Sequence, residues 1–234
     1  MAKKKLKTIR RAQGFYPERK RRIKRGVFIT FEGTEGCGKS THARLLVEHL
    51  KKEGYDCLLT REPGGTGAGE KIRDILLHSD SIDISDMTEL FLFEAARAQI
   101  VKEIILPALS KKRIVICDRY SDATLSYQGY GGRIDQGVIK KLSDISTGAL
   151  APDLTLLLDI DVKTGLERAK TKGCDRMEKK DLAYHRRVRG GYLAIAKREP
   201  ERVKVVRVAG SIDDTQKFIR NEADIVVRKF KRAG

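Results

Sequence analysis

The stretch from residue 27 to residue 41 has the residue types that hold phosphate groups in proteins. An apolar run ends at Gly33, and Gly38, Lys39 and Ser40 complete the pattern G-x-x-x-x-G-K-[ST] of a phosphate-binding loop. Glycines let the backbone bend so that successive N–H groups point at phosphate oxygens, and the lysine brings a cation to the same place. The serine hydroxyl is suited to bind Mg²⁺, and a helix that begins here directs its positive end at the anion. The predicted phosphate-binding residues are Gly33, Thr34, Glu35, Gly36, Cys37, Gly38, Lys39, Ser40 and Thr41.

A glycine-rich turn can match this pattern by chance, so the flanking segments decide between a turn and a binding loop. Residues 27–32 are largely apolar, as in a buried strand, and the apolar residues after Thr41 recur at helical spacing. A strand before the glycines and a helix after them are the context in which such a loop binds phosphate. We therefore interpret residues 33–41 as a nucleotide-binding loop.

The composition is that of a globular chain with a strongly basic beginning. With 234 residues, of which 40% are hydrophobic, the chain can bury a full core, and no apolar run is long enough to span a membrane. No apolar segment follows the first charges as in a secretory signal.

The net charge is +17, and the twelve Lys/Arg and one Glu of residues 1–26 supply +11 of it. We expect a basic, flexible N-terminal extension over 1–26. Three hypotheses remain open for it: contact with nucleic acid or another anionic surface, a solvated extension, or a start codon assigned too early.

The four cysteines indicate free thiols rather than a disulfide framework or a zinc site. Cys37, Cys57, Cys117 and Cys174 are far apart and form no C-x-x-C pair. Without a secretory segment, reduced thiols in a cytoplasmic protein are expected. The four histidines form no spaced cluster, so we assign them no metal or acid–base role.

Strand-like and helix-like segments alternate along residues 27–234, which favours a parallel sheet with helices on both faces. The predicted strands are 27–32, 57–60, 114–117, 154–158 and 203–208. The predicted helices are 41–52, 70–77, 87–110, 136–146, 162–169, 181–198 and 212–231. Residues 127–132 are expected to be a glycine-rich loop, and the charged segment 170–180 a mobile lid. With the phosphate loop on the first strand, the prediction is an α/β fold of the P-loop NTPase type, with three layers and a five-stranded parallel sheet.

Four short motifs follow the phosphate loop at spacings that resemble thymidylate kinase (dTMP kinase). They are Arg61-Glu62-Pro63-Gly64-Gly65-Thr66, Phe93-Glu94-Ala95-Ala96-Arg97, Asp118-Arg119-Tyr120 and Tyr127-Gln128-Gly129. The resemblance runs from about residue 27 to the C-terminus. It implies an enzyme that transfers the γ-phosphoryl group of ATP to dTMP with the help of Mg²⁺, in dTTP synthesis, and that forms a homodimer. Such transfer requires two anions brought into line and their charge neutralised, so a cleft rich in Arg and Lys is expected.

The resemblance also implies roles for individual residues. Phe93 would stack on thymine, Arg97 would reach the base edge, and Glu35 would contact the deoxyribose 3′-hydroxyl. Arg73 and Arg119 would hold the dTMP phosphate through planar guanidinium groups. The predicted dTMP-binding residues are Glu35, Arg73, Phe93, Arg97, Arg119, Thr124, Tyr127 and Gln128. The predicted catalytic residues are Lys39, Arg119, Arg176 and Asp118, and the predicted Mg²⁺ ligands are Ser40 and Asp118.

Arg176 is included because the interior of the phosphate loop, residues 34–37, contains no cation. In the arrangement of the family that this resembles, the catalytic cations come from the lid instead. Two other hypotheses remain open. One is another nucleotide or deoxynucleoside kinase of the same fold, and the other is a non-catalytic nucleotide-binding protein that docks on nucleic acid through its basic extension.

Overall fold

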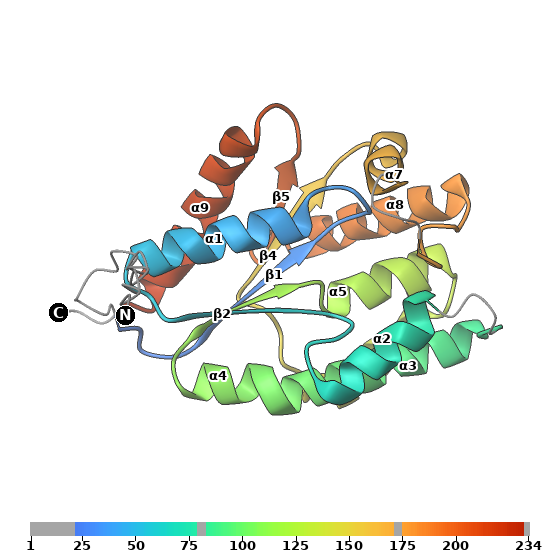
Figure 1. Ribbon diagram of the computed structural model, residues 1–234, viewed down its shortest axis with the longest axis horizontal. Coiled ribbons are helices and arrows are strands. Elements are labelled where there is room, and N and C mark those ends of the chain that lie inside the picture. Colours follow the sequence, from blue (N-terminus) through green and yellow to red (C-terminus); the bar gives the residue numbers. More distant parts are fainter. Residues whose placement is uncertain (1–21, 79–82, 171–174, 232–234) are drawn as a thin grey trace, which may run out of the picture.

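The computed structural model describes residues 22–78, 83–170 and 175–231 of the chain. Its centre is a sheet of five parallel strands in the order β2-β3-β1-β4-β5 (Figure 1). The strands are β1 (Val27–Glu32), β2 (Cys57–Arg61), β3 (Ile114–Asp118), β4 (Leu154–Asp159) and β5 (Val203–Arg207). Because β1 pairs with both β3 and β4, the phosphate loop leaves the middle of the sheet. The predicted fold, a five-stranded parallel sheet of the P-loop type, is confirmed.

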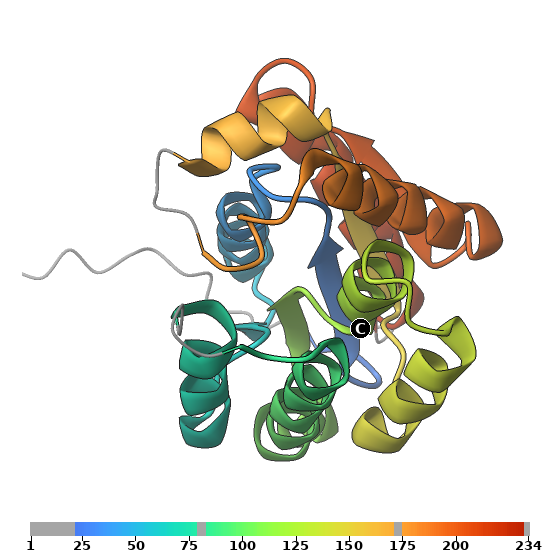
Figure 2. The ribbon, with the colours of Figure 1, turned by 90° about the vertical axis from the view of Figure 1, so that its right-hand side faces the viewer.

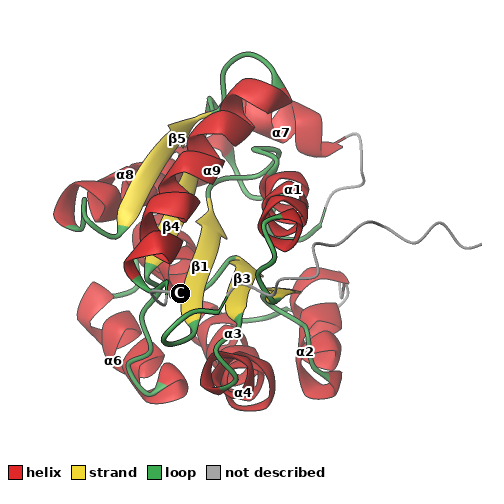
Figure 3. Ribbon diagram, turned by 90° about the vertical axis from the view of Figure 1, so that its left-hand side faces the viewer, coloured by secondary structure: helices red, strands yellow, loops and turns green. Residues whose placement is uncertain are grey.

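Helices cover both faces of this sheet (Figure 3). The longer ones are α1 (Lys39–Lys52), α2 (Gly67–His78), α3 (Asp86–Ile100), α6 (Gln136–Thr147), α7 (Val162–Lys170), α8 (Leu182–Arg198) and α9 (Ile212–Lys229). Alternate side chains of a strand point to opposite faces. In β1, Ile29 and Phe31 are therefore buried against α1 and α9, whereas Phe28 is buried in the core beneath Ile100 at the end of α3.

The long helix expected over 87–110 is present, with a change of hydrogen-bond pattern inside it. After α3 the chain continues through a π-helical segment, η1 (Val101–Ile105), into α4 (Leu106–Ser110). Pro107 lies in the first turn of α4, where the N–H that proline lacks is not required. The Ser85 side chain accepts a hydrogen bond from the N–H of Thr88, so Ser85 is the N-cap that starts α3.

Residues 127–132 do not form the expected loop. They belong mainly to a π-helical segment, η2 (Leu125–Gly131), that follows the short helix α5 (Ser121–Thr124). A Cβ atom on Gly131 would lie only 2.8 Å from side-chain atoms of Tyr184 and Val188 on α8. Glycine is therefore needed here for close packing of η2 against α8, and not for a turn, which is why the sequence pattern was misleading.

Residues 22–26, before the first strand, make defined contacts with the rest of the protein. Ile23 is buried and forms an isolated bridge with Lys231, and the N–H of Lys24 donates to the carbonyl of Phe230 at 2.7 Å. Arg25 forms an ion pair with Asp153. Residues 22–26 therefore differ from the flexible extension predicted for them, while residues 1–21 lie outside the described part. No helix among the described residues is both long and apolar enough to cross a lipid bilayer.

Candidate active site

The phosphate loop connects β1 to α1 and bends back over the end of β1. Gly36 and Gly38 have φ values of 65° and 93°, in the left-handed region that favours glycine. The Nζ of Lys39 donates to the carbonyl oxygens of Gly33 at 3.1 Å and Thr34 at 2.9 Å. The lysine is 8% exposed, so a cation is held inside the loop close to where phosphate oxygens would replace these carbonyls.

A hydroxyl and a carboxylate meet beside the loop. Ser40 Oγ donates to Asp118 Oδ2 at 2.5 Å, and Asp118 is the last residue of β3. Both are hard oxygen ligands, which Mg²⁺ prefers, and Mg²⁺ in nucleotide sites takes its remaining ligands from water and phosphate. Among the described residues there is no group of three or more His, Cys, Asp or Glu that could hold a metal ion alone. The Ser40–Asp118 pair therefore fits a magnesium ion that is shared with a nucleotide.

Arg119 connects the phosphate loop with the opposite wall of the site. Its φ of 71° is unusual for a residue with a side chain, and its N–H is held by the carbonyl of Phe31 at 2.9 Å. One guanidinium nitrogen donates to both carboxylate oxygens of Glu35, at 2.9 and 2.8 Å, and also to the hydroxyl of Tyr127 at 3.1 Å. Although burial by itself would raise it, Arg119 and Lys39 lower the pKa of Glu35 to about 2. Glu35 is thus a charged acceptor at neutral pH.

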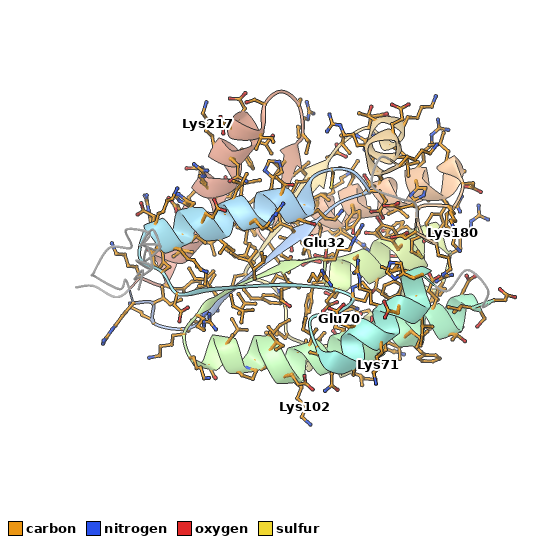
Figure 4. The ribbon with its side chains drawn as sticks, in the orientation of Figure 1. Glu32, Glu70, Lys71, Lys102, Lys180 and Lys217 are labelled. Carbon is orange, nitrogen blue, oxygen red and sulfur yellow. The ribbon has the colours of Figure 1, made fainter. Side chains whose placement is uncertain are left out.

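A second buried carboxyl, Glu32, is connected to Arg119 through the hydroxyl of Tyr192. Figure 4 shows it in the interior at the end of β1. Its oxygens accept from the N–H of Tyr120 at 2.7 Å and from the hydroxyl of Tyr192 at 2.8 Å, and Tyr192 also accepts from Arg119 at 3.3 Å. Burial, together with the charge of Asp122, raises the pKa of Glu32 to about 8. The neutral carboxyl predominates at pH 7.

One cavity of about 470 Å³ extends from the phosphate loop to the helices α2, α3 and η2. Figure 2 faces the end of the molecule where the phosphate loop, α2, α3 and α7 meet around it. All eight residues predicted to bind dTMP line this cavity, as do Lys39, Ser40, Thr41 and Asp118. Six basic side chains contribute to its wall, namely Lys39, Arg61, Arg73, Arg97, Arg119 and Arg168. This supply of positive charge is what two phosphate-bearing ligands require.

The 61–66 segment forms the wall next to α2. The carboxylate of Glu70 accepts from the N–H of Gly65 at 2.7 Å and from Arg61 at 3.0 Å, which fixes the segment to the first turn of α2. Arg73, one turn further along α2, donates to the carbonyl of Pro63 at 2.9 Å and faces the cavity. A half-buried guanidinium is thereby positioned away from the phosphate loop, at a second place for an anion.

Arg97 is fixed by two carboxylates. It is 2% exposed and donates to Glu62 at 2.8 Å, to Glu94 at 2.7 Å and to the carbonyl of Tyr120 at 3.1 Å. Burial raises the pKa of Glu62 to about 7, with Glu94 raising it further and Arg97 opposing. Within the described residues, these bonds use three of the five N–H donors of Arg97, which lines the cavity.

Arg176 does not line the cavity, in contrast to the prediction from the sequence. Its guanidinium donates to Glu89 at 2.5 Å and to the carbonyl of Leu76 at 2.9 Å. The carboxylate of Glu89 is nearly fully buried, and a buried carboxylate requires a charged partner. Arg168, at the end of α7, lines the cavity instead.

Several residues of the site were not identified from the sequence. Gly165 of α7 packs so closely on the phosphate loop that a Cβ there would lie 2.4 Å from the carbonyl oxygen of Glu35. A glycine inside a predicted helix was the available sign of this contact. Tyr192 lies on the apolar face of α8, where nothing in the pattern separates it from a core residue. Conversely, three members of the predicted phosphate-binding set do not line the cavity, namely Gly33, Thr34 and Cys37. These residues of the loop contact the Nζ of Lys39 instead.

Comparisons with known proteins agree with this geometry. The sequence profile of the family described as "Thymidylate kinase" matches residues 31–219. A thymidylate kinase of Geotalea uraniireducens is 45% identical over 201 residues, 83% of this chain and 94% of the relative. One from Synechococcus sp. is 49% identical over 185 residues, 79% of this chain and 88% of the relative. The crystal structure of thymidylate kinase from Ehrlichia chaffeensis superimposes with a TM-score of 0.71 at 35% identity, covering 85% of this chain and 98% of that one. The chain therefore belongs to the thymidylate kinase family and is an enzyme that phosphorylates dTMP in dTTP synthesis, with ATP as the phosphate donor.

Proposed function

We propose that the two ends of the 470 Å³ cavity bind the two substrates, with ATP phosphates on the loop and dTMP between the 61–66 segment and α3. The observation that carries this proposal is the distribution of cations along one continuous cavity. Lys39 lies at the loop, Arg73 lies on the opposite wall, and Arg119 lies between them, within hydrogen-bonding distance of Glu35. Phosphoryl transfer requires two anions in line and neutralised, and these three cations supply that arrangement.

The remaining wall fits a pyrimidine deoxynucleotide. We assign Phe93 to stacking on the base, because a half-buried aromatic ring contributes both apolar area and a flat face. Arg97, held by Glu62 and Glu94, presents its remaining donors to the base edge. Thr124, Tyr127 and Gln128 provide polar groups around the base and sugar. Glu35 is the acceptor for a sugar hydroxyl, since its carboxylate stays charged near neutral pH.

Magnesium would be held by Ser40 and Asp118 together with nucleotide phosphate oxygens, and when bound it neutralises phosphate charge. The sequence predicts Arg176 as the catalytic cation of the lid. We assign this role to Arg168 instead, because Arg168 lines the cavity and Arg176 is paired with Glu89. Asp175, Met177 and Glu178 also line the cavity, which supports the earlier prediction that the segment at about 170–180 closes over bound nucleotide. Residues 171–174 of that segment lie outside the described part.

The experiment that tests the proposal is an ADP-release assay with ATP, Mg²⁺ and a panel of acceptors. The acceptors are dTMP, dUMP, dCMP, AMP, GMP and thymidine, and we expect clear preference for dTMP. Lys39→Ala should lower kcat by about 10²-fold or more, because a charge in contact with the transferred phosphoryl group is lost. Lys102→Ala is the control, since Lys102 is an exposed lysine of η1 that does not line the cavity and points outward at the lower edge of the molecule in Figure 4.

The outcomes of this assay separate the proposals. Preference for another monophosphate would mean that the acceptor carries a different base. The assignment of Phe93 and Arg97 to thymine would then be wrong, although the transfer mechanism would stay the same. Transfer to thymidine but not dTMP would indicate a nucleoside kinase. No transfer to any acceptor, with ATP still bound, would leave a non-catalytic nucleotide-binding protein.

We also propose a homodimer that buries the outer surface of α3. Met87 and Phe91 of α3 are 40% and 53% exposed, and the flanking helices α2 and α6 add exposed Ile75, Val138 and Ile145. Exposed apolar side chains on neighbouring helices are typical of protein interfaces. Light scattering should give about twice the 26.3 kDa chain mass, and Phe91→Glu should give a monomer. Ile212→Glu on α9 is the control at another exposed apolar residue. A monomeric wild-type protein would contradict the proposal.

The cytoplasmic location expected from the sequence stays a prediction, supported by the thiols. Cys37, Cys57 and Cys117 are free and buried, as is typical of proteins in a reducing compartment. Burial raises the pKa of Cys57 to about 12, so this thiol is unreactive. The hypothesis that the extension 1–26 contacts nucleic acid is not tested by the structure, because residues 1–21 lie outside the described part.

A further inference from the structure

The end of the molecule opposite the active site gathers basic side chains from four separate segments of the chain. The amino ends of the strands lie here, whereas the cavity lies at their carboxyl ends. Figure 3 faces this end, and Figure 1 shows it at the left, where α1, α4 and α9 finish. The cations at this end are Arg22, Lys24, Arg25, Lys51, Lys52, Lys111, Lys112, Arg113, Arg228, Lys229 and Lys231. We call these residues the basic end.

Main-chain contacts fix the four segments next to one another. The N–H of Val27 donates to the carbonyl of Arg113 at 3.2 Å, and the backbone of Gly26 packs on Leu109. On the other side, Lys24 donates to Phe230 and Ile23 pairs with Lys231. The end of α1 joins the group because Asp56, just after it, forms an ion pair with Arg113. The clustering therefore follows from the fold.

Within the residues that the structure describes, most of these charges have no ion-pair partner. Arg25, Arg113 and Arg228 form ion pairs with Asp153, Asp56 and Asp224. For the other eight, no ion pair is present within the part of the chain that the structure describes. Ten of the eleven, all except Arg113, are exposed. A concentration of like charge lowers the stability of the folded protein through self-repulsion. The phosphotransfer reaction takes place at the other end of the sheet, so it does not account for this concentration of charge.

We propose that the basic end is a surface that binds the phosphate backbone of nucleic acid without regard to base sequence. A row of cations from four segments matches a repeating polyanion, whose binding releases condensed counterions. Residues 1–21, which lie outside the described part, contain nine Lys/Arg and one Glu in their sequence. Among the described segments 22–26, 51–53, 111–113 and 228–231, the aromatic residue is Phe230, whose ring is covered by the guanidinium of Arg25 at 3.8 Å and is not open for base stacking. We therefore expect binding of nucleic acid at the basic end to depend on contacts with phosphate groups and not on stacking with bases.

A membrane surface is the less favoured partner. Stable attachment to lipid combines basic residues with apolar side chains that insert between the headgroups. None of the large exposed apolar side chains found among the described residues belongs to residues 22–26, 51–53, 111–113 or 228–231. The surface thus supplies charge without an inserting group.

The test uses the full chain and a fluorescein-labelled 24-bp DNA duplex, with anisotropy measured from 50 to 200 mM salt. The variant replaces Lys51, Lys52, Lys111 and Lys112 with glutamine. Each phosphate contact contributes about 0.9 to the slope of log K against log salt, so the slope should fall by about two to four units. Affinity at 100 mM salt should fall at least about tenfold, and a second duplex of unrelated sequence should behave alike.

A variant with the same loss of charge elsewhere separates a defined surface from general attraction. The control replaces Lys71, Lys102, Lys141 and Lys217, which are exposed on other surfaces; three of them are visible in Figure 4. We expect the control to bind within about twofold of wild type, and the basic-end variant to keep full dTMP phosphorylation. Equal weakening by both variants, no duplex binding by the wild type, or binding only to phosphatidylserine vesicles would each overturn the proposal. Because kinase activity is read separately, failure here leaves the proposed function untouched.

Discussion

Replacement of Glu32 by glutamine should remove a large part of the pH dependence of stability. Glu32 is fully buried, and burial with the nearby charge of Asp122 raises its pKa from 4.5 to about 8. In the unfolded chain the carboxyl loses its proton near pH 4.5, but the folded protein keeps the proton until about pH 8. The folded state therefore binds more protons in this window, and stability falls as the pH rises through it.

The size of the effect follows from the two pKa values. One pKa unit corresponds to about 1.4 kcal/mol, so the contribution lost between pH 5 and pH 8 is about 3 kcal/mol, levelling off above pH 8. Glutamine is a neutral group of the same shape, and its oxygen and NH₂ can bond with the N–H of Tyr120 and the hydroxyl of Tyr192. Glu32→Gln should therefore be close to wild type at pH 5 and more stable by about 3 kcal/mol at pH 8.

Urea unfolding, followed by far-UV circular dichroism at pH 5, 6, 7 and 8, measures this difference. Glu62 and other titrating groups are common to both proteins, so their contributions cancel in the comparison. Glu167→Gln, at an exposed carboxylate of α7, is the control and should run parallel to wild type. A constant difference between Glu32→Gln and wild type across the pH range would refute the reasoning, because it would mean that Glu32 is charged in the folded protein throughout.

Two further predictions concern contacts that the sequence did not reveal. Tyr192→Phe removes the hydroxyl that connects Glu32 to Arg119, so kcat/KM for dTMP should fall about fivefold, for a loss of about 1 kcal/mol, while KM for ATP stays nearly constant. Steady-state kinetics with each substrate varied measures this, and an unchanged kcat/KM would show that Arg119 is held without Tyr192. Gly165→Ala places a Cβ 2.4 Å from the carbonyl of Glu35 and should destabilise the protein by about 2 kcal/mol and weaken ATP binding. Gly190→Ala on α8 meets nothing within 4 Å and is the matched control; equal thermal stability of the two variants would contradict tight packing of α7 on the phosphate loop.

The parts of the site that depend on local chain chemistry were predictable from the sequence. The phosphate loop combines glycine, lysine and serine at fixed spacing, and the strand-end residues Asp118 and Arg119 follow from the rule that ligands bind at the carboxyl ends of parallel strands. The parallel sheet itself followed from alternating strand-like and helix-like segments. Each of these inferences uses neighbours in the chain.

The parts that depend on distant partners were not predictable. Arg176 lies in a charged segment, and only the fold shows that Glu89, 87 residues away, takes up its guanidinium. The glycines of η2 have the composition of a loop, but Gly131 is needed for close packing against Tyr184 of α8. Residues 22–26 read as a continuation of the basic extension, because nothing local to them shows that Ile23 meets Lys231.

The most direct test of the central claim, two phosphate sites at the ends of one cavity, is calorimetric binding of dTMP and thymidine to wild type and to Arg73→Ala. The account predicts that the wild type binds dTMP much more tightly than thymidine. Arg73→Ala should reduce that preference by about ten- to a hundredfold, the value of a hydrogen bond to a charged group, with thymidine binding unchanged. An unchanged preference for dTMP in Arg73→Ala would contradict the account, since Arg73 would then not hold the acceptor phosphate.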